Sequence, residues 1–289
     1  MVFTEKYEEY LNYFNEKLET YCNKLDCQPK ILNDSIKYSL TLGGKRIRPV
    51  LTFAVGDLLG VPKEKLVNFA LAIELIHTYS LIHDDLPEMD DADFRRGKPS
   101  NHKVFGTGNA VLAGDALLNT AYSILFSECF NGNEYISASK FICDAAGIYG
   151  MIGGQSADLL HESDNTVDED VLYFIYSNKT AKLIIAPIIV PSILNGGKNY
   201  SKLKFFGEKL GLLFQFTDDV LDVEGKFEEL GKTTGKDENK YTGVKLYGLE
   251  GCKVKSELLC DECLKILESI EGDTQFLTEF VNFIVKRTN

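Results

Sequence analysis

Apolar side chains recur every three or four residues along almost the whole chain, which is the spacing of helices that bury one face. No segment alternates apolar and polar residues well enough to predict a strand, so we expect an all-α fold. The pattern predicts helices over about residues 4–25, 33–42, 46–59, 62–86, 108–129, 134–160 and 200–223, another that carries Lys179, and two amphipathic helices at the end of the chain.

Proline and glycine set several of the predicted boundaries. Pro87 should end the helix over 62–86, because proline lacks an amide hydrogen and restricts the residue before it. Residues 87–104 are expected to form a loop, and so are residues 225–243, where glycines lie among charged side chains. No linker or repeat divides the chain, so we predict a single domain over residues 1–289.

The composition narrows the class of protein. Hydrophobic residues make up 44% of the chain, which suits a compact globular protein, and the formal charge of -12 argues against a nucleic-acid partner. Seven cysteines without a repeating framework favour a reducing compartment. The most apolar run, Leu183 to Leu194, is too short to span a bilayer, and residues 1–10 do not resemble a signal peptide. We therefore expect a cytoplasmic protein without stable membrane insertion.

Three carboxylates followed by two arginines stand at the end of the predicted helix over 62–86. The carboxylates are those of Asp84, Asp85 and Asp90, and the arginines are Arg95 and Arg96. Carboxylate oxygens bind divalent cations, and guanidinium groups pair with phosphate oxygens. The segment therefore predicts a site for a polyanion that carries metal ions.

A second acidic motif lies on the predicted helix over 200–223. Gln215, Asp218, Asp219 and Asp222 follow the i, i+3, i+4, i+7 spacing and share one face of a helix that is otherwise apolar. Buried charge is costly unless it is paired or bound to metal, so this polar stripe should line a cavity inside a helical bundle. The alternative for each motif is an ordinary solvated face, but two such motifs on apolar helices argue against it.

Several further motifs complete an ordered series. They are Gly43 to Pro49, Asp84 to Lys98, Leu112 to Leu118, Gly153 to Gln155, Lys179 with Thr180, and Phe214 to Asp222. In this order they resemble the trans-prenyltransferases, or polyprenyl diphosphate synthases, over nearly the whole chain, and most closely the bacterial farnesyl diphosphate synthases. The resemblance implies an isoprenoid-synthase helical bundle around a deep central cavity, usually as a homodimer.

The same resemblance implies a head-to-tail condensation of an allylic diphosphate with isopentenyl diphosphate. Mg²⁺, with three ions expected when diphosphate is bound, would neutralise the departing diphosphate as the allylic C–O bond breaks. The isopentenyl double bond would attack the carbocation, and the released diphosphate would accept the proton. Apolar walls must exclude water, which would quench the cation.

The resemblance also assigns roles to individual residues. Asp84, Asp90 and Asp218 would bind Mg²⁺ directly, while Asp85 and Asp222 would be close ligands or would orient water on the metal. The allylic diphosphate would be held by Arg95, Lys179, Gln215 and Lys232, and isopentenyl diphosphate by Lys45, Arg48, His77 and Arg96. Lys179, Thr180 and Gln215 form the expected catalytic group, and Lys232 and Lys240 would lie in a lid. Lys182 stands where the family usually has a small residue.

Product length should depend on the residues just before Asp84. Helical side chains lean toward the N-terminus, and ideal geometry places Ser80 one turn below Asp84, with Tyr79 to the side. Only the resemblance makes Tyr79 the floor of the pocket, which would stop growth at the C15 product, farnesyl diphosphate. The open alternatives are a geranylgeranyl diphosphate synthase and a non-catalytic subunit of a heteromeric synthase. A terpene cyclase would lack Lys45, Arg48 and Arg96.

Overall fold

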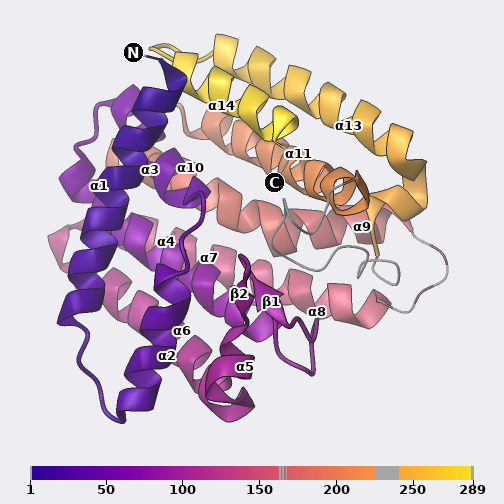
Figure 1. Ribbon diagram of the computed structural model, residues 1–289. Helices are drawn as coiled ribbons and strands as arrows, with labels where there is room; N and C mark the ends of the chain where they lie inside the picture. Colours follow the sequence, from indigo (N-terminus) through magenta and orange to yellow (C-terminus); the bar gives the residue numbers. More distant parts are fainter. Residues whose placement is uncertain (1, 163, 165, 167, 225–240, 288–289) are drawn as a thin grey trace.

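The computed structural model describes residues 2–162, 164, 166, 168–224 and 241–287, and these form a bundle of helices (Figure 1). Among the described residues, the only strands are β1 (Phe94–Arg95) and β2 (Lys98–Pro99), which pair antiparallel with Phe94 opposite Pro99. The predicted all-α fold is confirmed.

The helices follow in chain order as α1 (Phe3–Lys24), α2 (Lys30–Thr41), α3 (Ile47–Leu59), α4 (Lys63–Asp84), α5 (Asn101–Phe105), α6 (Thr107–Glu128), η1 (Cys129–Asn131), α7 (Asn133–Ala146), α8 (Met151–His161), α9 (Glu169–Ile175), η2 (Tyr176–Ala181), α10 (Lys182–Leu194), α11 (Tyr200–Glu224), α13 (Gly243–Glu268) and α14 (Gln275–Lys286). Figure 1 shows α13 and α14 lying along α11 at one side of the bundle.

The one predicted helix over 134–160 is wrong, because the chain breaks it into α7 and α8. Gly147 has an extended backbone, and the amide of Gly150 donates to its carbonyl oxygen at 3.0 Å. A Cβ atom on Gly150 would lie 2.1 Å from the carbonyl oxygen of Ala145, so the turn requires glycine there. The loop predicted over 87–104 also contains short elements, namely β1, β2 and α5.

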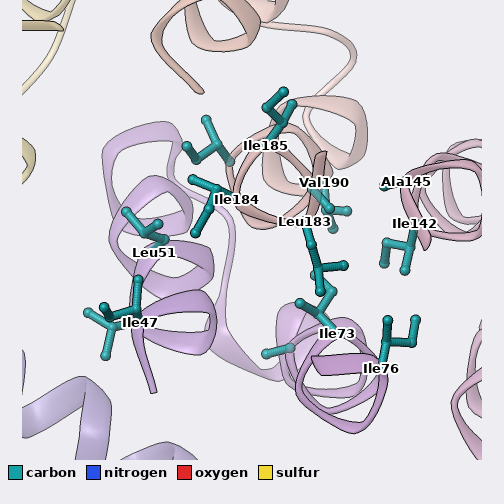
Figure 2. Packing of buried hydrophobic residues seen from close by; sticks show 14 of the residues in the cluster. Ile47, Leu51, Ile73, Ile76, Ile142, Ala145, Leu183, Ile184, Ile185 and Val190 are labelled. Atoms are coloured by element: carbon teal, nitrogen blue, oxygen red, sulfur yellow. The ribbon is translucent and has the colours of Figure 1, made fainter. Parts of the chain in front are cut away.

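Helix α10 forms the centre of the apolar core. Its residues from Leu183 to Ser192 are all buried, including two prolines inside the helix. Figure 2 shows Ile184 beside Leu51 of α3, Leu183 beside Ile73 of α4, and Val190 on the side of Ile142 and Ala145 of α7. A helix surrounded on all sides has no polar face, which explains why this run is apolar throughout.

A buried ion pair fixes the start of α3. The residue before this helix, Arg46, has a left-handed backbone with a φ of 48°. Its Nη1 atom donates to Oε1 of Glu74 on α4 at 2.7 Å, and its Nη2 atom donates to the carbonyl oxygen of Leu40 at 2.6 Å. Arg46 is 4% exposed and Glu74 is 1% exposed. The pair therefore holds the segment that carries Lys45 against the core.

By length and composition, two helical stretches would be long and apolar enough to cross a membrane. They are Lys63–Asp84 and Thr107–Asn131, and the apolar window of the first is 67% buried inside the bundle whereas that of the second is 33% buried. The first is α4, the helix that carries Glu74, and its burial marks it as a core helix of the bundle. The second carries exposed apolar side chains such as Leu112 and Phe126.

We predict that Glu74→Ala lowers the free energy of unfolding by about 3–5 kcal/mol, because it leaves the buried Arg46 guanidinium without its carboxylate. Urea unfolding would measure the loss. The control is Glu64→Ala at an exposed site of the same helix, which should change stability by about 0.5 kcal/mol or less. Equal midpoints for the two variants would show that the pair does not stabilise the fold.

Candidate active site

A cavity of about 1120 Å³ opens among α3, α4, α6, α8, η2 and α11. The residues expected from the sequence that line it are Lys45, Arg48, His77, Tyr79, Ser80, Asp84, Arg95, Arg96, Lys179, Thr180, Asp218 and Asp222. Three expected residues, Asp85, Asp90 and Gln215, are not among its lining residues. Lys232 and Lys240 fall outside the described part of the chain. Lys182 begins α10 and does not line the cavity either.

The first acidic motif forms a tight turn at the end of α4. The helix ends at Asp84, and the backbone amide of Asp90 returns to donate to the Asp84 carbonyl oxygen at 2.8 Å. Asp85 is 2% exposed, and Nε of Arg95 donates to both of its carboxylate oxygens at 3.1 and 3.2 Å. Burial raises the pKa of Asp85, and the Arg95 charge opposes that rise. This geometry makes Asp85 the residue that orients Arg95 at the cavity wall.

The polar stripe of α11 divides into two pairs, each with four-residue spacing. Asp218 and Asp222 line the cavity. Gln215 and Asp219 instead face η2, where the Oε1 atom of Gln215 accepts a hydrogen bond from Oγ1 of Thr180 at 2.7 Å. Asp219 is 5% exposed, and burial raises its pKa to about 7, against hydrogen bonds that favour the ionised form. The polar face of α11 therefore places Asp218 and Asp222 at the cavity, and Gln215 and Asp219 against η2.

Lys179 and Thr180 lie in η2, a π-helical turn between α9 and α10. Nζ of Lys179 pairs with Oδ2 of Asp158 on α8 at 2.5 Å. Two glycines allow neighbouring helices to approach this turn. A Cβ atom on Gly154 of α8 would lie 2.1 Å from the backbone nitrogen of Lys179, and one on Gly211 of α11 would lie 2.3 Å from Cβ of Ala181. Such π-turns widen a helix locally and are frequent at functional sites.

Cationic side chains collect at the end of the cavity near α3. Burial lowers the pKa of Arg48 to about 10, and burial together with neighbouring arginines holds the pKa of His77 well below its usual range. Among the described residues, the buried Nε of Arg48 has no hydrogen-bond partner. The guanidinium of Arg96 rests against Gly44, where a Cβ atom would lie 2.6 Å from Cζ. Such a cluster of donors fits a diphosphate.

The sequence interpretation missed Arg287, which follows α14 and lines the cavity. Its guanidinium lies 3.9 Å above the ring of Phe214, forms an ion pair with Asp218 and donates to the Phe214 carbonyl oxygen at 2.9 Å. Burial lowers the pKa of Lys45, and the charge of Arg287 lowers it further. Nothing in the local sequence around residue 287 points to this position.

The carboxylates fit Mg²⁺ that is shared with a ligand. Among the described residues, no group of three His, Cys, Asp or Glu side chains is close enough to hold an ion by itself. Asp84, Asp218 and Asp222 nevertheless line one cavity with the cationic cluster. Mg²⁺ is usually bound through one or two carboxylates plus substrate phosphates and water, so the donor set suits an ion that arrives with a diphosphate.

Carboxylates from two helices, cations at one end and an apolar remainder define a helical enzyme cavity suited to diphosphate chemistry. Comparisons with known proteins agree. A sequence model of the family described as Polyprenyl synthetase matches residues 29–279. The chain is 40% identical over 283 residues to a farnesyl diphosphate synthase of Micrococcus luteus, covering 96% of each chain.

Two further relatives differ in their stated activity. A putative chloroplastic geranylgeranyl pyrophosphate synthase of Arabidopsis thaliana is 44% identical, over 85% of this chain and 71% of the relative. The solved geranyltransferase of Helicobacter pylori, complexed with magnesium and isoprenyl diphosphate, superposes with a TM-score of 0.84 at 33% identity, covering 96% of this chain and 95% of the other. The chain belongs to the polyprenyl synthetase family and is a prenyltransferase.

We predict that Gly154→Ala lowers kcat at least about 100-fold, because the new methyl group displaces the backbone of Lys179 and misplaces the side chains beside it. Steady-state kinetics would measure the change. Gly108→Ala is the matched control, since a Cβ atom there meets nothing within 4 Å. Wild-type kinetics for Gly154→Ala would contradict the close approach of α8 and η2.

Proposed function

We propose that this prenyltransferase condenses dimethylallyl and geranyl diphosphate with isopentenyl diphosphate to give farnesyl diphosphate. The observation that carries the proposal is the position of Tyr79, a bulky side chain that lines the cavity five residues before Asp84 and is 6% exposed. Full-length similarity to a bacterial farnesyl diphosphate synthase supports it. The similarity to geranylgeranyl pyrophosphate synthases supports a second candidate function, the synthesis of the C20 product geranylgeranyl diphosphate.

In the proposed mechanism, Asp84, Asp90, Asp218 and Asp222 would hold Mg²⁺, which would supply positive charge to stabilise the departing diphosphate. Arg95, fixed by Asp85, and Lys179, beside Asp158, hold the allylic diphosphate. Because both cations already have carboxylate partners on the protein, their positions are set before substrate binds, which lowers the reorganisation that the reaction requires.

The cationic cluster would hold the second substrate. Lys45, Arg48 and Arg96 would bind the isopentenyl diphosphate, with neutral His77 as a hydrogen-bonding neighbour. The partly apolar wall that includes Phe214 and Leu221 would exclude water from the carbocation. Thr180 would face the reacting centre from η2, and Gln215 of α11 would support it from behind through their hydrogen bond. Lys232 and Lys240 remain proposed lid residues.

We further propose a cytoplasmic homodimer of one domain per chain. Exposed apolar side chains are numerous on α6, α7, α8 and the turns beside them, which are neighbouring elements of the bundle, and this concentration supports a dimer interface. These side chains are Val111, Leu112, Phe126, Phe130, Ile136, Ile148, Tyr149, Ile152 and Leu160. The family match over residues 29–279 supports the single domain.

We expect the purified protein to form the C15 product from dimethylallyl and isopentenyl diphosphates when Mg²⁺ is present, and to lose this activity on chelation. Chromatography of the dephosphorylated products would identify their length. Asp84→Asn, which removes one carboxylate from the cavity, should lower kcat by about 100-fold or more. A C20 product would favour the second candidate, and no product would favour a non-catalytic subunit.

Tyr79→Ala should extend the product beyond C15, because it removes the proposed floor, whereas Ser80→Phe should shorten it if Ser80 lies beside the growing chain. Both residues line the cavity. Tyr135→Ala makes the same substitution at a residue that does not line the cavity and should leave product length unchanged. An unchanged C15 product from Tyr79→Ala would reject Tyr79 as the floor.

A further inference from the structure

A chain of hydrogen bonds runs from the start of α13 through α11 to η2. The backbone amide of Gly243 donates to Oδ2 of Asp219 at 2.8 Å, and the hydroxyl of Tyr176 also donates to that oxygen. The other oxygen, Oδ1, accepts from Nε2 of Gln215 at 3.1 Å. Oε1 of Gln215 then accepts from Oγ1 of Thr180 at 2.7 Å. Three elements, α13, α11 and η2, are thereby joined through the buried carboxylate of Asp219.

Asp219 sets the donor-to-acceptor direction of these hydrogen bonds. An ionised carboxylate only accepts hydrogen bonds, so the amide group of Gln215 must turn its NH₂ toward Asp219 and its oxygen toward Thr180. Because that oxygen also only accepts, Thr180 must use its single hydroxyl hydrogen on Gln215. The hydroxyl oxygen of Thr180 therefore offers the cavity lone pairs and no hydrogen.

We propose that Asp219 is a positioning residue that acts through Gln215 to present the Thr180 hydroxyl as an electron-rich dipole to the allylic carbocation. The inference rests on the proposed function, because a diphosphate that leaves an allylic carbon creates the positive charge in question. A fixed negative dipole end near a forming cation stabilises the transition state, whereas a hydroxyl hydrogen pointing at the cation would oppose it.

The surroundings of Asp219 separate this role from metal binding. The residue is 5% exposed and does not line the cavity, unlike its neighbour Asp218. Its two oxygens together accept three hydrogen bonds from Gly243, Tyr176 and Gln215. A Cβ atom on Gly243 would lie 3.0 Å from Oδ2, so the backbone closes over the carboxylate on that side. An ion would have to displace these donors to reach it.

The test is Asp219→Asn, which keeps the size of the side chain. The two donors at Oδ2 hold the remaining oxygen in place, so the new NH₂ faces Gln215 and reverses its amide. Thr180 then accepts from Gln215, and its hydrogen turns toward the cavity. We expect kcat to fall about 100-fold, while the KM values for both diphosphates and the Mg²⁺ concentration for half-maximal activity change less than about twofold.

A double-mutant cycle with Thr180→Val distinguishes the proposed route from a general structural effect. If Asp219 acts through the Thr180 hydroxyl, Asp219→Asn causes no further loss of kcat in the Thr180→Val background. Gln215→Met removes the central member of the hydrogen-bond chain and should likewise cause no further loss of kcat in the Thr180→Val background. This second variant keeps the test usable if Asp219→Asn does not fold. Asp57→Asn, which alters an exposed carboxylate bonded to Tyr10 at 2.7 Å, is the matched control and should keep wild-type kcat.

Losses that multiply in the double variants, or a shift in the Mg²⁺ requirement on Asp219→Asn, would overturn the inference. The failure of the proposed function is a different outcome: the wild-type protein itself would then form no prenyl product. If the wild-type protein is active but the losses of kcat multiply in the double variants, only the proposed role of Asp219 is rejected.

Discussion

The cost of burying charge inside an apolar bundle governs the surroundings of the cavity. An isolated ionised group in a core is strongly unfavourable, so a buried charge is stable when it has a partner, and the pairing also fixes the positions of both groups. Glu74 holds Arg46, and Asp85 holds Arg95. Asp219 is compensated by three neutral donors, which stabilise a carboxylate without a counter-charge. The pairs leave Lys45, Arg48 and Arg96 as positive charge at the cavity.

Backbone approach is the second constraint, and glycine makes it possible. The π-turn η2 stands between α8 and α11, and both helices come closer to it than any side chain would permit, at Gly154 and Gly211. Backbone contacts of this kind leave little freedom for Lys179 and Thr180, which project from the turn. Gly154, within the Gly153 to Gln155 motif, therefore allows α8 to pack closely against η2, and the proposed chemical roles are those of the neighbouring Lys179 and Thr180.

Sequence periodicity was sufficient for the fold and for the cavity face of α11. An apolar helix with a narrow polar stripe has few arrangements other than an internal polar cavity. Periodicity could not separate Asp218 from Asp219, because adjacent residues on one polar face differ only in the element packed against them. The partner of Asp85 was equally hidden, since Arg95 reaches it through the short pairing of β1 and β2.

A long-range contact explains one of the other omissions, and local backbone geometry explains the second. Arg287 pairs with Asp218 across 69 residues of sequence, and no local pattern encodes such a contact. The break between α7 and α8 depends on a close approach of Gly150 to the preceding turn, which is visible only once the chain has folded. Glycine in a helical pattern is common enough that the sequence alone does not distinguish a break from a tolerated residue.

The proposed floor of the pocket depends on how α4 packs against α6. The ring of Tyr79 meets that of His83 edge-on, with centroids 5.7 Å apart. His83 in turn lies 3.0 Å from the Val111 carbonyl oxygen and directly against Gly114 of α6, where a Cβ atom would lie 2.0 Å from Nε2. Because Gly114 leaves room for this imidazole, α4 and α6 can pack closely enough to hold the Tyr79 ring. The depth of the cavity therefore depends on helix packing as well as on the size of one side chain.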